Sequence, residues 1–301
     1  MDPPHRRVWS GLAHADDSDT PADVGILGLP SDDASSFRRG SAKAPDRIRS
    51  LTPHTAPFAE DGNPLTNLRV RDYGNAEAES TWEAFALAAQ AAAENVLRHP
   101  FALFLGGDHA VTIPLFAAAA RALTGPIGVF YLDAHLDLMD TFEKRAWSHA
   151  CTARRIFDSL AVEPSRTAFL GTRSWLGNER TYVDQHPELA VYTAQHVFAN
   201  SIRSTADSVC RQLSGVKSVY VTIDIDVLDP AFAPGTGTPE AGGLSTRDLL
   251  ELLRIVFRRL PVRALDLVEV SPPLDHNDIT SFAAIKVIYE VFGWVRAGRT
   301  A

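Results

Sequence analysis

Short apolar runs alternate with longer amphipathic stretches along most of the chain. The apolar runs are Val24–Leu29, Leu68–Val70, Phe101–Leu105, Ile127–Leu132, Arg166–Leu170, Leu189–Tyr192, Ser218–Ile223 and Val262–Val268. Several of these runs are apolar at nearly every position, which is typical of parallel strands that are covered on both faces. The pattern therefore predicts a mostly parallel sheet of about eight strands.

Apolar residues with helical spacing lie between many of these runs. The predicted helices are Trp82–Leu97, Val111–Leu123, Cys151–Leu160, Ile202–Leu213, Thr246–Leu260 and Ile279–Val295. Alternation of strands and helices along the whole chain is typical of an α/β protein. We expect a single-domain three-layer αβα sandwich over residues 23–297. Residues 1–22 mix charged residues, proline and small residues without a period, and we expect them to form a loose N-terminal arm.

Composition narrows the class of protein. The 301 residues are 45% hydrophobic and 22% charged, and the net charge is 29 − 37 = −8. These values are typical of a soluble globular protein, and the negative charge argues against nucleic acid or an anionic membrane as a partner. No apolar run reaches the roughly 18 residues of a transmembrane helix. Two cysteines give no disulfide framework and the N-terminal segment lacks the apolar core of a secretory signal, so we expect a cytoplasmic protein.

Ionisable residues directly follow four of the predicted strands. The four segments are Gly106–His109, Asp133–Asp137, Asp224–Asp226 and Glu269–Pro273. Ligands of open α/β sheets bind beyond the carboxyl ends of the strands. We therefore expect these segments to form one site at that edge of the sheet.

The spacing of the acidic residues favours a metal site. In extended backbone, residues two apart point the same way, so Asp133, His135 and Asp137 can project together. Asp224 and Asp226 can do the same. A single aspartate after a strand is commonly a helix cap or a turn residue, but carboxylates crowded at one buried edge repel one another, and two divalent cations would neutralise them. Oxygen and imidazole ligands without a thiolate favour an ion such as Mn²⁺ over a structural Zn²⁺.

These segments resemble the signature sequences of the ureohydrolase family, which includes arginase, agmatinase and formiminoglutamase. The matching segments are Gly106–His109, Asp133–Asp137, Asp224–Pro230 and Gly235–Glu240. A further segment, Ser35–Gly40, resembles the family's N-terminal Arg-x-Gly sequence, although Ala44-Pro45 stands where relatives usually have Gly-Pro. The resemblance extends from about residue 24 to 297. It implies an arginase-like fold and the hydrolysis of a guanidinium group to urea and an amine.

The same resemblance implies two Mn²⁺ ions per subunit and a homo-oligomer, either a trimer or a hexamer. The residues that match the family's metal ligands are His109, Asp133, His135, Asp137, Asp224 and Asp226. By the same match, Asp137 would also orient the attacking hydroxide, His149 would deliver a proton to the leaving amine, and Glu269 would face the guanidinium. Thr238 matches a hydroxyl beside that guanidinium.

The sequence departs from arginases where the far end of the substrate would bind. Arginase-like enzymes carry an asparagine at the position of Met139, where it helps to hold the amino acid head group. Asp140 is a candidate to face a cationic tail, and Trp175 is a candidate to line a slot for an alkyl chain. The interval from Asp137 to His149 looks more like that of agmatinases. We therefore expect an agmatine-type substrate.

Several other functions stay open. One is a guanidinobutyrase or another hydrolase of a guanidino acid or natural product, in which Lys144 or Arg145 would pair with a carboxylate tail. Metal-dependent deacetylases share an arginase-like sheet but use one Zn²⁺, and His109 and His135 argue against that class. A non-enzymatic metal-binding relative is disfavoured because no expected ligand is missing from the sequence. Arginase and formiminoglutamase activities are also less favoured.

Overall fold

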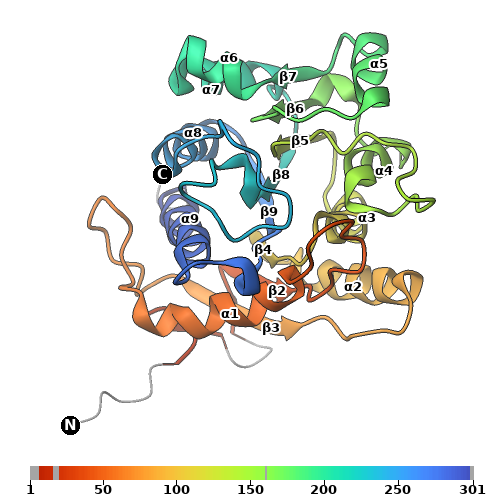
Figure 1. Cartoon of the computed structure of the whole chain (residues 1–301). Helices are drawn as coiled ribbons and strands as arrows, with labels where there is room; N and C mark the ends of the chain where they lie inside the picture. Colours follow the sequence, from red (N-terminus) through yellow and green to blue (C-terminus); the bar gives the residue numbers. More distant parts are fainter. Residues whose placement is uncertain (1–6, 16–19, 160, 299–301) are drawn as a thin grey trace.

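A computed structural model describes residues 7–15, 20–159 and 161–298. Within these residues, nine strands form one sheet in the order β1-β3-β2-β4-β9-β8-β5-β6-β7, and neighbouring strands are parallel (Figure 1). The strands are β1 (Ala13–His14), β2 (Val24–Gly28), β3 (Arg69–Asn75), β4 (Phe101–Leu105), β5 (Ile127–Leu132), β6 (Thr167–Leu170), β7 (Ala190–Tyr192), β8 (Ser218–Asp224) and β9 (Val262–Val268).

Helices cover both faces of this sheet. They are α1 (Ala44–Leu51), α2 (Trp82–Val96), α3 (Thr112–Ala122), α4 (Thr152–Asp158), α5 (Gly177–Gln185), α6 (Ala194–Asn200), α7 (Ile202–Gln212), α8 (Thr246–Arg259) and α9 (Ile279–Ala297). Helices α1, α7, α8 and α9 contribute side chains to one buried hydrophobic cluster, and α2, α3 and α4 contribute to a second one. Because the strands contribute to both clusters, the sheet lies between two helical layers. The expected three-layer α/β fold is confirmed.

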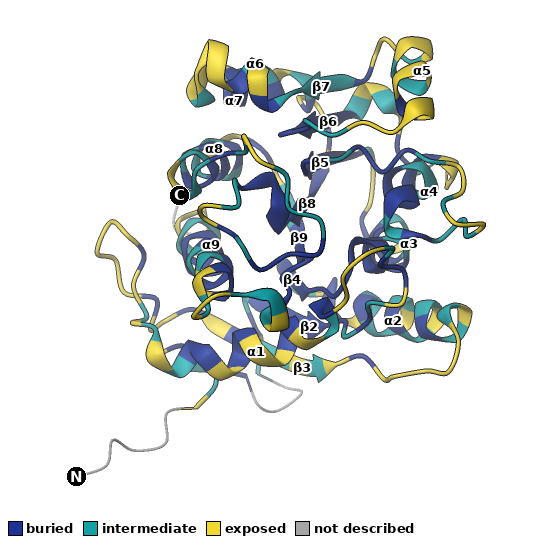
Figure 2. Ribbon diagram, viewed as in Figure 1, coloured by how far each residue is buried: buried dark blue, intermediate teal, exposed yellow. Residues whose placement is uncertain are grey.

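The central strands have the burial that their composition predicts. Strands β4, β5 and β8 are buried at every position, and Figure 2 shows them at the centre of the molecule. All eight expected strands are present, and β4, β5 and β9 have the expected bounds. In the part of the chain that the structure describes, no helix is long and apolar enough to cross a membrane.

The six expected helices correspond to α2, α3, α4, α7, α8 and α9. The expected end of α4 at Leu160 lies outside the described residues. Sequence reasoning missed α1, α5 and α6. These three helices have only seven to nine residues each, which is too short for a clear helical period to stand out.

The expectation of a loose N-terminal arm is wrong for residues 7–15. Trp9 is fully buried, its ring lies edge-on to Phe292 at 5.9 Å, and its indole N–H donates to Asp72 Oδ2 (2.6 Å). Strand β1 then extends the sheet beside β3. One buried tryptophan and a two-residue strand leave no period in the sequence, and for this reason the pattern did not reveal them. Residues 1–6 and 16–19 of the expected arm lie outside the described residues.

Trp9→Phe is expected to lower the free energy of unfolding by about 1–2 kcal/mol. The variant keeps an aromatic ring against Phe292 but leaves the Asp72 carboxylate without its indole donor, and a buried hydrogen bond to a charged group contributes on this scale. Denaturant unfolding measures the change. Ser10→Ala, at the next position, is the control and should leave the midpoint unchanged. Equal stability of Trp9→Phe and the unaltered chain would contradict the packed N-terminal segment.

Candidate metal centre

The sheet order brings the four acidic segments together. Strands β4, β9, β8 and β5 are consecutive neighbours, so their carboxyl ends lie side by side at one edge. Each of these ends carries one of the four segments found in the sequence. The residues come from positions as far apart as 108 and 269, and the site therefore forms only when the sheet is complete.

The loop after β4 packs tightly against the loop after β2. An ideal Cβ on Gly107 would lie 1.8 Å from the carbonyl oxygen of Ser31, so only glycine fits at this close approach. The main-chain N–H of Asp108 donates to the same carbonyl (2.8 Å), and the Asp108 carboxylate accepts the main-chain N–H of Ala34 (2.7 Å). These contacts fix the backbone that carries His109 and hold the loop after β2 over the site.

Two of the acidic segments begin with the same tight turn. The Asp133 carboxylate accepts the main-chain N–H of His135 (2.6 Å), and the Asp224 carboxylate accepts that of Asp226 (2.8 Å). Strand β5 ends at Leu132, so the expectation of extended backbone through Asp137 is wrong. The side chains converge because this turn redirects the chain.

Backbone strain is found at two site positions. Asp137 has φ of 52° and Glu269 has φ of 61°, in the left-handed region that residues other than glycine seldom adopt. Such strain persists only where the surrounding structure holds it, and it is concentrated at functional sites.

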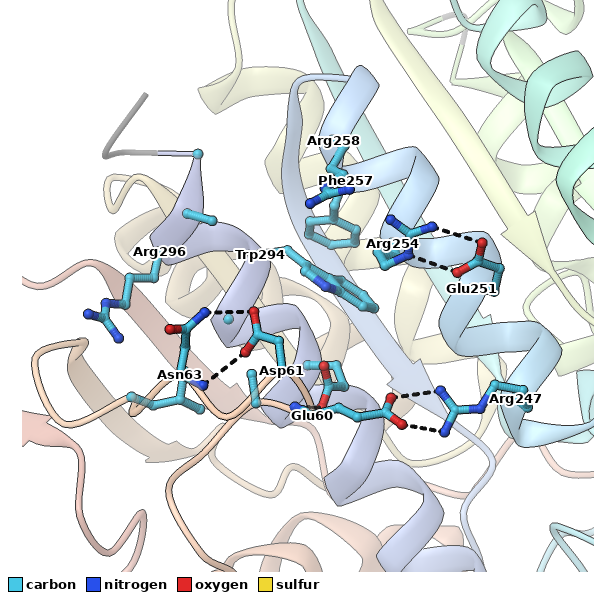
Figure 3. Close-up of a pocket in the computed structure, with 16 residues that line it drawn as sticks. Glu60, Asp61, Asn63, Arg247, Glu251, Arg254, Phe257, Arg258, Trp294 and Arg296 are labelled. Carbon is cyan, nitrogen blue, oxygen red and sulfur yellow. Dashed lines mark hydrogen bonds and ion pairs between the residues drawn. The ribbon is translucent and has the colours of Figure 1, made fainter.

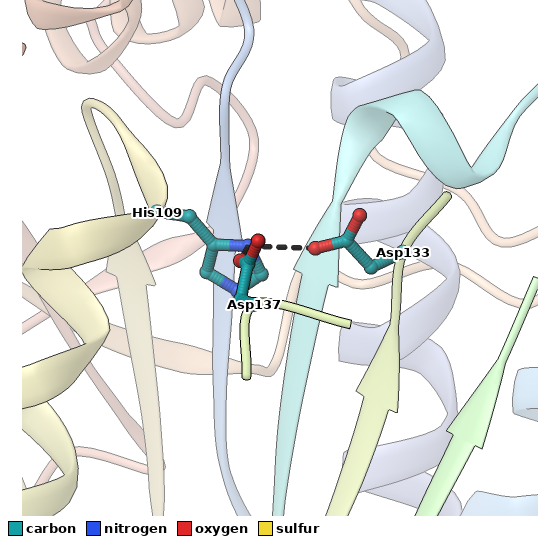
Figure 4. A group of neighbouring side chains, drawn as sticks. All are labelled: His109, Asp133 and Asp137. Atoms are coloured by element: carbon teal, nitrogen blue, oxygen red, sulfur yellow. Dashed lines mark ion pairs between the residues drawn. The ribbon is translucent and has the colours of Figure 1, made fainter. Parts of the chain in front are cut away.

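The first cluster gathers around His109 (Figure 4). Its Nδ1 lies 2.9 Å from Asp133 Oδ2, 3.2 Å from Asp137 Oδ2 and 3.3 Å from Asp224 Oδ2. All four side chains are buried. The Tyr131 hydroxyl donates to Asp137 Oδ2 (2.8 Å) and orients that carboxylate.

The second cluster gathers around His135. Its Nδ1 lies 3.2 Å from Asp133 Oδ1 and 3.2 Å from Asp226 Oδ2, while its Nε2 lies 3.9 Å from Glu240 Oε1. Asp133 thus offers one oxygen to each cluster. The structure brings together all six residues that the sequence suggested as metal ligands, and Asp133 stands between the two groups.

Charges in the two clusters strongly perturb one another. Burial and the neighbouring carboxylates raise the pKa of Asp133 to about 6 and that of Asp224 well above its usual range. Burial opposes a charge on His109, but hydrogen bonds to the carboxylates outweigh burial and raise its pKa well above the usual value. Burial also works against ionisation of Asp226, yet the charge of His135 lowers the pKa of this carboxyl. The field at this edge of the sheet favours cations.

The donor set fits divalent metal ions. The potential ligand atoms of His109, Asp133 and Asp137 lie within 4.8 Å of one another, and so do those of Asp133, His135 and Asp226. Asp133 Oδ2 and Asp226 Oδ2 are buried and accept no well-aligned hydrogen bond from the described residues. Carboxylate oxygens and imidazole nitrogens that face one another without such bonds are suitable ligands for Mn²⁺-class ions.

Sequence reasoning missed a buried polar network behind His109. Thr222 Oγ1 lies 2.9 Å from His109 Nε2 and donates to Asp266 Oδ1 (2.5 Å), while Tyr220 and Thr112 hydroxyls donate to Asp266 Oδ2. A hydroxyl has one proton, which Thr222 gives to Asp266, so Thr222 must accept from the ring's Nε2–H. The neutral ring then presents an unprotonated Nδ1 to the carboxylates, as a metal ligand must. Polar residues at 222 and 266, each between two apolar neighbours in its strand, were the available signal.

Thr222→Val is expected to weaken metal binding by about 10–100-fold, since partners that orient a ligand contribute on this scale. Valine keeps the shape of threonine but accepts no hydrogen bond, so the ring loses its orientation and its tautomer. Titration of the metal-free chain with Mn²⁺ measures the affinity. Thr205→Val, a buried threonine on α7, is the control with unchanged affinity. Unchanged affinity in Thr222→Val would disprove the ordering role of the network.

The expected catalytic residues lie next to the two clusters. Glu269 Oε1 accepts the main-chain N–H of His109 (2.9 Å) and lies 3.4 Å from His149 Nδ1. A Cβ on Gly237 would lie 2.8 Å from the carbonyl oxygen of Arg38, so glycine lets the loop before Thr238 pass close to the backbone of the loop after β2. Thr238 follows directly on the same loop and is half-buried.

The expected specificity residues are half-buried or exposed, and several already have partners. Met139 is half-buried, and its main-chain N–H donates to the carbonyl of Ala150 (3.1 Å). Asp140 forms an ion pair with Arg155 (2.9 Å) and is therefore already partnered. Trp175 is 37% exposed. Arg145, the candidate partner for a carboxylate tail, likewise pairs with Glu143 (2.9 Å).

A separate cavity of about 750 Å³ lies against α8 and α9, and none of the site residues line it. Figure 3 shows two ion pairs among its lining residues, Glu60–Arg247 and Glu251–Arg254. Its aromatic wall is formed by Phe257 and Trp294. The cavity is distinct from the metal centre.

Known proteins resemble this chain over most of its length. The model of the arginase family matches residues 22–293. The chain belongs to the arginase family. This membership confirms the resemblance of the sequence motifs and the expectation of a hydrolase of linear amidines.

The arginase-family member described here is similar to several named relatives. It is 35% identical to proclavaminate amidinohydrolase from Streptomyces clavuligerus over 92% of this chain and 90% of that protein. It is 33% identical to agmatinase from Bacillus cereus, over 91% and 92%. The solved structure of the Streptomyces clavuligerus proclavaminate amidinohydrolase superposes with a TM-score of 0.86 at 32% identity, covering 95% of this chain and 96% of that one.

Proposed function

We propose that this chain is a binuclear-manganese amidinohydrolase that converts a small guanidino compound of the agmatine type to urea and an amine. The observation that carries the proposal is the pair of carboxylate–imidazole clusters that share Asp133 and lie beside Glu269. Family membership supports the reaction class.

The ions would be held by the residues whose ligand atoms converge. His109, Asp137 and Asp224 would hold one ion and His135 and Asp226 the other. Asp133 has an oxygen in each cluster and would be shared by both sites, and the family resemblance implies the same for Asp224. When bound, two Mn²⁺ ions supply hydroxide at neutral pH by lowering the pKa of water.

The remaining residues bind the guanidinium and move a proton. Glu269 is a planar acceptor that suits the planar guanidinium, and Thr238 adds a hydroxyl beside it. Asp137 would orient the hydroxide by a hydrogen bond. Burial opposes a charge on His149. The hydrogen bond and the negative charge of Glu269 outweigh this effect of burial and raise the pKa of His149 to about 9. The ring therefore holds a proton at neutral pH, and the departing amine needs one because it cannot leave as an anion.

A second candidate substrate class is a guanidino acid. One observation favours it: relatives include a human mitochondrial guanidino acid hydrolase at 32% identity. The ion pairs of Asp140 with Arg155 and of Arg145 with Glu143 do not separate the two classes, because each occupies a residue proposed to meet one kind of tail. Urea release from agmatine, guanidinobutyrate, guanidinopropionate and arginine after Mn²⁺ loading tests both candidates. Release from none of them would reject the proposed function. Sizing of the same preparation tests the trimer or hexamer that the motifs imply.

Full activity is expected to require two Mn²⁺ ions per chain, because the structure offers two ligand clusters rather than one. Elemental analysis alongside urea release measures this. Activity should rise with metal content until two ions are bound and fall when a chelator removes them. Full activity with a single bound ion would contradict the binuclear site.

A further inference from the structure

His149 has partners on both ring nitrogens, and one of them has no assigned role. Its Nδ1 faces Glu269 Oε1 at 3.4 Å. On the other side, Nε2 lies 2.8 Å from the hydroxyl oxygen of Ser36 and accepts the main-chain N–H of Ser36 at 3.3 Å. Two groups of a single residue therefore meet one ring nitrogen.

We propose that Ser36 is a positioning residue for His149, holding the ring so that its Nδ1–H faces Glu269 and the reacting centre. The inference rests on the proposed function, in which His149 delivers the proton. It goes beyond that function because it assigns the orientation and the proton location of the ring to a residue of the loop after β2.

The main-chain N–H of Ser36 decides the tautomer of the neutral ring. An amide N–H only donates, so Nε2 must be unprotonated where the two meet, and the ring proton is then on Nδ1. This is the nitrogen that faces Glu269. This neutral tautomer is not itself the acid, because loss of its single ring proton would leave an imidazolate. The amine receives the Nδ1 proton from the doubly protonated ring.

The Ser36 hydroxyl stabilises the doubly protonated ring of His149. When both ring nitrogens carry protons, Nε2–H points at an amide N–H that cannot accept it. The hydroxyl oxygen at 2.8 Å can accept this proton, and it can equally donate to Nε2 when the ring is neutral. Ser36 is thus the partner that serves His149 in both protonation states.

The loop that carries Ser36 is firmly anchored. The Asp108 carboxylate holds the main-chain N–H of Ala34 (2.7 Å), and the Asp32 carboxylate holds that of Gly40 (2.7 Å). The main-chain N–H of His149 also lies 3.5 Å from the carbonyl of Ala34. Ser36 therefore stands at a fixed place relative to the strand ends, which a positioning role requires.

Ser36→Ala tests the proposal through the pKa of His149. The variant keeps the amide that favours the neutral ring and removes the acceptor that the charged ring needs, so this pKa should fall by about one unit. The negative groups that face the ring are Glu269 after β9, Asp137 after β5 and Asp108 after β4, and the substitution leaves all three in place.

Two readouts measure the change in the Mn²⁺-loaded enzyme. The alkaline limb of the kcat profile should move to lower pH by the same unit, while KM changes little. Independently of activity, diethyl pyrocarbonate modifies only an unprotonated ring nitrogen, so the pH dependence of His149 modification, followed by peptide mass spectrometry, reports the same pKa. Ser36→Thr keeps a hydroxyl and should restore the original values.

Ser35→Ala is the matched control, because this neighbouring hydroxyl is buried and meets no hydrogen-bond partner among the described residues. It should leave both profiles unchanged. An unshifted His149 pKa in Ser36→Ala, or equal shifts in the Ser35 and Ser36 variants, would overturn the proposal. Absence of urea release from every guanidino compound would instead reject the proposed function, and the modification profile would still decide the role of Ser36.

Discussion

Arginine is expected to be hydrolysed at least about 10³-fold less efficiently than agmatine, measured as kcat/KM under identical Mn²⁺ loading. The reacting guanidinium is the same in both compounds, so the discrimination must come from the far end of the substrate. Met139 offers no side-chain hydrogen bond there, and its main-chain N–H is already donated to Ala150. Burying an unpaired α-amino acid head group costs several kcal/mol, and the loss of one or two such contacts corresponds to this ratio.

Met139→Asn provides the matched variant for this prediction. An asparagine at this position can hydrogen-bond the amino acid head group, so arginine hydrolysis should improve relative to agmatine. Efficient arginine hydrolysis by the unaltered chain would overturn the agmatine-type assignment. A preference for guanidinobutyrate would instead assign the chain to the hydrolases of guanidino acids. Arg145 would then be the candidate that pairs with the carboxylate tail.

Glu269→Gln is expected to lower kcat/KM by at least about 10²-fold while metal content persists, a loss of roughly 2.7 kcal/mol of transition-state stabilisation. The amide keeps the size of the carboxylate but removes the negative charge opposite the guanidinium. The six residues proposed as metal ligands do not include Glu269, so elemental analysis should show an unchanged metal content. Steady-state kinetics of urea release measures the effect.

Glu143→Gln serves as the control for this variant, because Glu143 is an exposed carboxylate paired with Arg145 rather than a neighbour of His109. Its activity should stay close to that of the unaltered chain. Near-normal turnover in Glu269→Gln would show that Glu269 does not bind the guanidinium. Loss of metal from Glu269→Gln would show that the Glu269 carboxylate is needed for metal binding instead.

The strands and the clustering of the acidic residues at their ends were predictable because their signals are local. Buried parallel strands are continuous apolar runs, and the acidic residues directly follow them. All four segments were expected at one edge because the carboxyl ends of parallel strands lie on the same side of a sheet, where ligands of α/β proteins bind. The resemblance to family motifs then indicated which of these aspartates would belong to one metal site.

Contacts that depend on the order of the strands could not be predicted in the same way. Thr222 and Asp266 meet because β8 and β9 are neighbours, and no local pattern states that adjacency. Ser36 contacts His149 although the two residues are 113 positions apart in the sequence. The packed Trp9 was missed for a similar reason, since its partners Asp72 and Phe292 lie far along the chain.

The position of β9 in the sheet has a consequence for synthesis of the protein on the ribosome. This strand is the last to be made, yet it lies between β4 and β8 and joins the β1-β3-β2-β4 half of the sheet to the β8-β5-β6-β7 half. Until Val262–Val268 has left the exit tunnel, the two halves have no shared hydrogen-bonded edge. His109 and Asp224 therefore meet only after β9 has been made, and a nascent chain stalled before β9 should be unable to assemble the first cluster.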